Sequence, residues 1–313
     1  EEILQSCGYE TRHVNLRFDQ PGYLRVPLVS LELPRTILSL PKGTELCLQY
    51  PVTKLLFKWH WLLKKRCVRL TTIVHDIESV RYTGKLSEEE REQLSCFDSI
   101  IAHTPAMREL LISSGISADR IRLLQLFDYL ATPPSPSPLN YQEGMPREVC
   151  FAGNLGKSLF LPELQQIVGA NLHVLLYGVG LSEEVELSEE LQFKGKFAPD
   201  DLTLLRGHYG LVWDGDSITT CTGRIGEYLK INAPHKASLY IAAGIPLIVW
   251  RHSAIAPYVL EHQLGIAVDS LLELPKRLAS IDVAQYTRYR EAVQVEQMKI
   301  TQGLHLRNII SAL

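Results

Sequence analysis

The chain has 313 residues, 46% of them hydrophobic and 21% charged, with a formal net charge of -3 at pH 7. These totals indicate a globular protein of two ordinary domains or one large one, exclude extensive disorder, and give no general case for nucleic-acid binding. No apolar run approaches the ~20 residues of a membrane span, and no signal peptide is visible. The 6 cysteines form no CxxC pair, which favours free thiols in a reducing compartment.

In the first part of the chain, apolar β-branched runs alternate with helical patterns. Strands are expected at 10–16, 45–51, 67–76, 98–104 and 120–129. Helices are expected near 29–40, over 52–66, after a cap at Ser87 and from about Pro105, with a loop at 77–86. Because the segment before Tyr9 is typical of a helix end, we also expect a first strand and its turn to precede Glu1. This alternation predicts a parallel, doubly wound sheet.

Residues 132–146 contain five prolines and form the one clear linker. The alternation then restarts, with strands expected at 147–153, 171–178, 191–195, 210–213, 245–250 and 265–268, and helices at 162–168, 200–206 and 235–243. We therefore predict an α/β fold of two Rossmann-like domains, 1–131 and 147–281, facing a cleft, with helices at 282–313 that can pack back on the first domain. Ligands of such sheets bind beyond the carboxyl ends of the strands.

The segment from Tyr209 to Trp250 predicts an anion site. Pro234 suits the first turn of the expected helix, and Gly244 stands where a left-handed C-cap is needed. Lys236 and Ser238 fall in the opening turn, where unpaired N–H groups and the helix dipole favour an anion. We expect a phosphate-bearing ligand at this junction.

Gly153 and Asn154 close the first strand of the second domain. Glycine would let the backbone approach a ligand, and asparagine could bind a phosphate or sugar. The position at the carboxyl end of a strand favours this role over the alternative, a simple turn. Without a GxGxxG motif, a dinucleotide is not favoured.

His75 and Asp76 close a strand of the first domain. An ionised aspartate there could take a proton from a hydroxyl nucleophile; the alternative is a cap for the following segment. Glu78, Arg81 and Tyr82 follow closely and could bind an acceptor sugar.

Asp214-Gly215-Asp216 invites a metal interpretation, because a DxD after a strand holds a divalent cation in one class of glycosyltransferase. Here Lys236 and a helix N-terminus could already neutralise a diphosphate. We therefore expect no metal, and assign Asp214 to a sugar hydroxyl or to the loop.

The stretch from Lys54 to Arg66 interleaves basic and aromatic residues. It could rest on an anionic membrane surface. An ordinary crossover helix with lysines extending to solvent explains it slightly better.

Five segments, HDIESVR, FAGN, YGLVWDGDS, GEYLKINAPHKASLYIAAGIPLIVW and LGIAV, carry a family resemblance. They resemble the bacterial galactofuranosyltransferases of O-antigen assembly and, less closely, the accessory glucosyltransferases that extend glycans on streptococcal adhesins. The resemblance implies a GT-B fold and inverting, metal-independent transfer from UDP-galactofuranose, with no cofactor. The product would be a β-galactofuranoside, with a β-1,6 linkage to a hexose of a lipid-linked acceptor. It also implies a cytoplasmic protein at the inner face of the membrane; a homo-oligomer is left open.

The resemblance assigns roles to individual residues. It implies Asp76 as the base and donor contacts at Asn154, Tyr228, Lys230, His235, Lys236 and Ser238. We add Gly153, Tyr177, Phe197 and Asp214 on the donor side, and His75, Glu78, Arg81 and Tyr82 on the acceptor side.

Two other functions remain open, namely a glucosyltransferase using UDP-glucose and a non-catalytic subunit that binds a nucleotide sugar. A nucleotide-sugar epimerase is disfavoured, because the chain lacks both GxGxxG and a suitably placed YxxxK pair.

Overall fold

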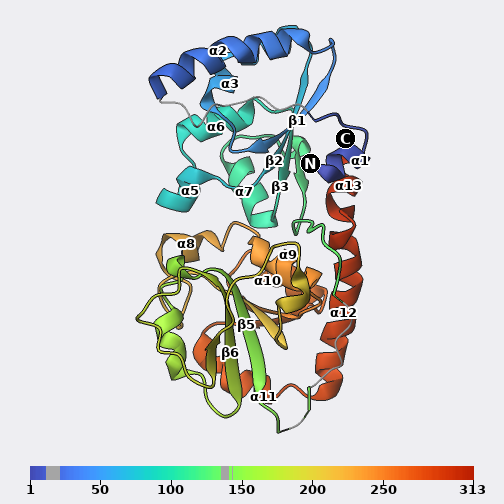
Figure 1. Cartoon of the computed structure of the whole chain (residues 1–313). Coiled ribbons are helices and arrows are strands. Elements are labelled where there is room, and N and C mark those ends of the chain that lie inside the picture. Colours follow the sequence, from blue (N-terminus) through green and yellow to red (C-terminus); the bar gives the residue numbers. More distant parts are fainter. Residues whose placement is uncertain (12–21, 135–140, 143) are drawn as a thin grey trace. The chain divides into compact units, whose positions relative to one another are not determined.

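The computed structural model describes residues 1–11, 22–134, 141–142 and 144–313, and Figure 1 labels most of its helices and several of its strands. The strand expected at 10–16 lies mostly outside these residues. The chain divides into two units, one comprising Glu1–Leu124 with Ile309–Leu313 and the other Gln125–Asn308. Each unit is built on its own parallel sheet.

The first unit contains a four-stranded sheet in the order β1-β2-β3-β4, with every pair parallel. The strands are β1 (Glu45–Tyr50), β2 (Arg69–Val74), β3 (Ser99–Ala102) and β4 (Ile121–Leu123). Five of the six residues of β2 and all four of β3 are buried, as expected for central parallel strands covered on both faces.

Two helices precede β1, and helices follow each of the first three strands. They are α1 (Glu2–Ser6), α2 (Gly22–Ser39), α3 (Lys54–Lys58), α4 (His60–Lys65), α5 (Glu78–Thr83), α6 (Glu88–Ser95) and α7 (Pro105–Ser113), with a short 3₁₀ turn at Ala118–Arg120. The predicted start of α6 is confirmed, because the Ser87 hydroxyl accepts a hydrogen bond from the Glu90 amide at 3.2 Å. The single helix predicted over 52–66 is instead two, separated at Trp59.

The loop predicted at 77–86 is wrong, because this segment contains α5. Its start is held by Glu90 of α6, whose carboxylate accepts hydrogen bonds from the amides of Glu78 (3.1 Å) and Ser79 (2.8 Å). A carboxylate there satisfies the unpaired N–H groups of the first turn. The cap comes from another helix, so no local pattern indicates it.

The second unit contains a six-stranded parallel sheet in the order β10-β9-β8-β5-β6-β7. Its strands are β5 (Arg147–Asn154), β6 (Leu172–Val179), β7 (Leu191–Phe193), β8 (Tyr209–Val212), β9 (Leu247–Trp250) and β10 (Gly265–Val268). From the central strand β5 the chain builds β6 and β7 on one side, then returns to add β8, β9 and β10 on the other. The strand order therefore reverses between β5 and β8, which is the topological switch point where such sheets bind ligands.

The helices of this unit are α8 (Gly223–Tyr228), α9 (His235–Ala242), α10 (Ala256–Glu261), α11 (Leu274–Ala279) and α12 (Val283–Thr301), followed by α13 (Leu304–Ile310), which runs into the first unit. The C-cap prediction for α9 is confirmed, since Gly244 has φ of 74°. The helices expected at 162–168 and 200–206 are shorter 3₁₀ segments, Leu161–Gln166 and Leu202–Leu204.

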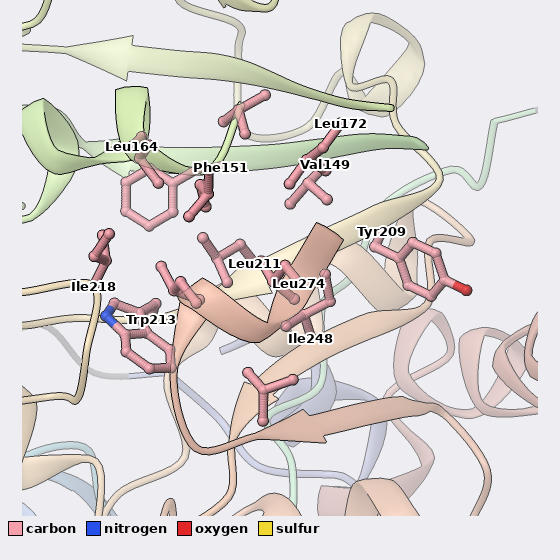
Figure 2. Close-up of a cluster of buried hydrophobic side chains, with 14 of the residues drawn as sticks. Val149, Phe151, Leu164, Leu172, Tyr209, Leu211, Trp213, Ile218, Ile248 and Leu274 are labelled. Atoms are coloured by element: carbon pink, nitrogen blue, oxygen red, sulfur yellow. The ribbon is translucent and has the colours of Figure 1, made fainter. Parts of the chain in front are cut away.

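Apolar layers cover both faces of the second sheet. Val149 and Phe151 of β5 point into one cluster, while Cys150 and Ala152 between them join the other. Figure 2 shows the first cluster, where Val149 and Phe151 meet Leu211 and Trp213 from the β8 segment. Because β5 and β8 are packed on both faces, the residues at the carboxyl ends of these strands are held in defined positions.

A buried acid fastens the C-terminal helices of this unit. Glu296 of α12 is 2% exposed, and its carboxylate accepts hydrogen bonds from Tyr258 (2.7 Å) and Lys299 (2.8 Å), with His305 Nε2 also at 2.8 Å. Burial opposes the charge, but the hydrogen bonds from His305, Lys299 and Tyr258 outweigh it and lower the pKa of Glu296 to about 2.

Replacement of Glu296 by glutamine should therefore destabilise the protein in a pH-dependent way. Because the folded pKa lies below the ordinary 4.5, this stabilisation is present above pH 4.5 and is lost as pH falls toward 2. Glu296→Gln should cost about 3 kcal/mol at pH 7 and much less at pH 3. Urea unfolding at both pH values measures this difference, with Glu291→Gln at an exposed site on the same helix as the control. An equal cost at both pH values would show that the charge of Glu296 contributes nothing.

Candidate functional site

The carboxyl ends of β5 and β8 carry the central group of candidate residues. Gly153 and Asn154 end β5, while Trp213 and Asp214 directly follow β8. The two strands are neighbours in the sheet, so these residues share one edge at the switch point.

Lys236, the second residue of α9, extends across this edge. Its Nζ lies 2.6 Å from Asp214 Oδ1 and 3.3 Å from the Trp213 carbonyl oxygen, and 4.5 Å from the centre of the Phe151 ring. A Cβ added to Gly153 would stand 3.2 Å from Lys236 Cε. The structure therefore brings together three predicted donor residues, Gly153, Asp214 and Lys236. The Lys236 and Asp214 side chains are each 17% exposed, so the cation remains accessible.

Glycines let β5 and β6 end in close contact. A Cβ on Gly178, which has φ of 139°, would lie 1.8 Å from the Gly153 carbonyl oxygen, so the position accepts only glycine. Beside this contact, Asn154 Oδ1 accepts a hydrogen bond from the Gly156 amide at 3.1 Å and begins the 3₁₀ turn Leu155–Lys157. Asn154 thus forms the simple turn that the sequence analysis gave as the alternative to ligand binding.

Other predicted donor residues lie in separate contacts of the same unit. The Tyr177 hydroxyl accepts from the Arg206 amide at 3.2 Å, and its ring meets Phe197 edge-on at 6.0 Å. His235 stacks on Phe127 with 4.1 Å between ring centres.

The α8 segment carries two more donor candidates. Tyr228 is 4% exposed, whereas Lys230 is exposed and lies 2.5 Å from a Glu227 carboxylate oxygen. Lys230 Nζ also lies 5.4 Å from the centre of the Trp250 ring. Trp250 was not among the predicted site residues, because as the last apolar residue of a strand it looks like core.

Ser238 lies deeper in the unit than its position in the first turn of α9 suggests. It is 0% exposed, and its hydroxyl has no hydrogen-bond partner within the described ranges.

The two acids of the DxD sequence are engaged separately. Asp214 pairs with Lys236, while the Asp216 carboxylate occupies the space beside Gly223, 2.4 Å from where a Cβ would stand. Among the residues that the structure describes, no group of three or more histidine, cysteine, aspartate or glutamate side chains is arranged to hold a metal ion.

In the first unit, Asp76 follows β2 and pairs with Arg81 of α5. Arg81 Nη1 donates to Asp76 Oδ2 at 2.7 Å, and the two side chains are 28% and 32% exposed, respectively. Burial lowers the pKa of the adjacent His75, which favours its neutral form. Tyr82 is 58% exposed, and the backbone N–H of Glu78 donates a hydrogen bond to the Glu90 carboxylate. The structure thus brings Asp76 and Arg81 together, and Glu90, which the sequence did not indicate, holds the helix that carries Arg81.

The stretch from Lys54 to Arg66 is partly core. Leu56, Leu62 and Leu63 are buried, while Trp61 is 56% exposed and Lys54 pairs with Glu89 at 2.6 Å. Among the described helices, none combines the length and the apolar character that a membrane-spanning segment requires.

Family models match nearly the whole chain. The model described as "Glucosyltransferase 3-like, N-terminal domain" matches residues 2–126, and "Glucosyltransferase 3-like, C-terminal domain" matches 149–313. The chain is 29% identical to the β-1,6-galactofuranosyltransferase WbbI of Escherichia coli K12 over 311 residues, covering 94% of this chain and 88% of WbbI. It is 24% identical to glucosyltransferase 3 of Streptococcus gordonii, covering 79% and 71%.

A solved structure shares the fold. HepE of Anabaena, in complex with UDP and glucose, superposes with a TM-score of 0.58 at 14% identity, covering 94% of this chain and 84% of HepE. Two parallel α/β units with this likeness constitute a GT-B fold, as predicted.

Proposed function

The chain belongs to the glucosyltransferase 3-like family of glycosyltransferases, and from this premise we propose that it transfers a hexose from a UDP-sugar to a hydroxyl group of a glycan acceptor. The observation that carries the proposal is the position of Lys236 at the switch point of the second sheet. Donor diphosphates need positive charge that is fixed before the reaction begins. A lysine held between a carboxylate, a carbonyl oxygen and an aromatic ring meets that need.

The donor we propose is UDP-galactofuranose. The support is the 29% identity to WbbI, which is named a β-1,6-galactofuranosyltransferase, over 94% of this chain. The acceptor would be a hexose of a lipid-linked intermediate in O-antigen assembly, with peripheral contact at the inner membrane face. UDP-glucose is the second candidate donor, supported by the 24% identity to a glucosyltransferase 3.

The proposed transfer inverts the anomeric centre and uses no metal. Asp76 accepts the proton of an acceptor hydroxyl, whose oxygen attacks the anomeric carbon of the donor as the bond to UDP breaks. Arg81 donates a hydrogen bond to the Asp76 carboxylate and holds it in one orientation. Lys236 and the N–H groups of the first turn of α9 stabilise the charge on the departing UDP.

Ligand-induced stabilisation tests the proposal. UDP and UDP-galactofuranose at about 100 times their Kd should raise the melting temperature by about 5–10 °C, whereas GDP-mannose should leave it unchanged. UDP release should then require both the donor and an acceptor glycan. Binding without release would identify a non-catalytic subunit, and the absence of any shift with UDP compounds would refute a UDP-sugar donor.

A further inference from the structure

Two tryptophans stand side by side at the carboxyl edge of the second sheet, and they differ in one respect. The register pairs Val212 with Val249, so the residues that follow, Trp213 and Trp250, are neighbours. Both belong to the same buried cluster, with exposures of 0% and 3%. Trp213 Nε1 donates to the Ser217 carbonyl oxygen at 3.0 Å, whereas Trp250 Nε1 has no hydrogen-bond partner within the described ranges.

Leaving a buried indole N–H unpaired is costly, since an unsatisfied buried donor loses about 1–3 kcal/mol relative to one that is paired. Native proteins keep few such groups, and each one that persists calls for an explanation such as a functional role, an ordered water or an ion. Trp213 follows the neighbouring strand at the same edge, and its N–H donates to a carbonyl oxygen. A tryptophan at this edge of the sheet can therefore have a hydrogen-bond partner. The indole N–H of Trp250 is therefore available to donate a hydrogen bond to a group outside the described residues.

Two further unmatched atoms lie on the segments around Trp250. Ser253, which is 4% exposed, and Asn232 have a buried hydroxyl and a buried Oδ1, respectively, without a partner in the part of the chain that the structure describes. The segments are joined, because the Ala254 amide donates to the Leu229 carbonyl oxygen at 2.8 Å. The Ser253 amide also donates to the Trp250 carbonyl oxygen at 3.0 Å. One pair of adjoining turns thus holds three polar atoms without partners.

The chemistry of these atoms indicates the class of ligand. Trp250 Nε1 can only donate, Asn232 Oδ1 can only accept, and the Ser253 hydroxyl can do both. A phosphate at neutral pH mainly accepts hydrogen bonds, so it matches the Asn232 side chain only when the amide presents its nitrogen. Sugar hydroxyls both donate and accept, and they match all three atoms. Trp250 also ends the strand next to β8, whose following residues anchor Lys236.

We propose that Trp250 Nε1, the Ser253 hydroxyl and Asn232 Oδ1 bind hydroxyl groups of the hexose carried by the nucleotide donor. The inference rests on the proposed function, because it takes the diphosphate of that donor to lie at Lys236. It adds Trp250 as a specificity-determining residue, which recognises the sugar and leaves recognition of the nucleotide unchanged.

The test compares Trp250→Phe with Trp213→Phe by calorimetric titration with UDP, UDP-galactofuranose and UDP-glucose. Phenylalanine removes the N–H and keeps most of the apolar ring. Trp250→Phe should bind UDP within about twofold of wild type, lose at least tenfold in affinity for the preferred UDP-sugar, and unfold at a similar urea concentration. Trp213→Phe, which leaves the Ser217 carbonyl oxygen without its donor, should lose stability.

Ser253→Ala provides a second variant with little change in volume, and it should also weaken UDP-sugar binding while UDP binding is kept. If both variants bind the UDP-sugar as wild type does, the inference is wrong and the proposed function stands. The same holds if Trp250→Phe loses as much stability as Trp213→Phe, because the indole N–H would then have a structural partner such as water. If wild-type protein does not bind UDP, the proposed function fails and the inference falls with it.

Discussion

Replacement of Lys236 by methionine is expected to lower the transfer rate by about 10²–10³-fold, the range seen when a fixed electrostatic contact to the transition state is removed. Methionine keeps the aliphatic stem against Gly153 and Phe151 and removes only the ammonium group. The measurement is UDP release under saturating donor and acceptor. Lys276→Met, at an exposed position on α11, is the matched control and should retain wild-type turnover.

One complication is that Lys236→Met leaves the Asp214 carboxylate, which is 17% exposed, without its partner. The double variant Lys236→Met/Asp214→Asn removes both charges and should recover any stability that the single variant loses. It should remain as inactive as the single variant, because the missing positive charge is what slows the reaction. Turnover within about twofold of wild type in either variant would refute the role assigned to Lys236.

Replacement of Asp76 by asparagine is expected to lower kcat by about 10²–10⁴-fold, the contribution of a positioned general base. Asparagine keeps the shape and can still contact Arg81, but it cannot take a proton from the acceptor. The Kd for UDP should stay within about twofold of wild type, because the proposed nucleotide contacts lie in the other unit. Steady-state turnover and calorimetry with UDP measure the two quantities separately.

Glu92→Gln, an exposed acid on α6 of the same unit, is the control for a general charge effect and should leave both quantities unchanged. Should Asp76→Asn instead weaken UDP binding with kcat preserved, Asp76 would be a structural residue that holds Arg81. The ion pair with Arg81 at 2.7 Å is the contact that such a structural role would use. Comparing the effect of Asp76→Asn on kcat with its effect on the Kd for UDP distinguishes the two roles.

The sequence alone was sufficient for the parallel α/β organisation of both units. Apolar β-branched runs such as the one at Leu247–Trp250 fold as buried strands because only a sheet covered on both faces can accept them. The cap at Ser87 and the left-handed turn at Gly244 were also readable, since each depends on residues a few positions away. The family resemblance in the sequence was likewise carried by short segments such as FAGN and LGIAV.

Only the tertiary structure decided which of these residues meet. Lys236 reaches Asp214 across 22 residues of sequence, and Glu90 starts α5 from a different helix. Gly178 has to be glycine because of a carbonyl oxygen on the neighbouring strand. Trp213 and Trp250 look alike in sequence, but among the residues that the structure describes only the Trp213 indole finds a hydrogen-bond partner. The physical reason is that caps and strand patterns depend on nearest neighbours along the chain, whereas charge pairing, close packing and hydrogen-bond satisfaction depend on neighbours in space.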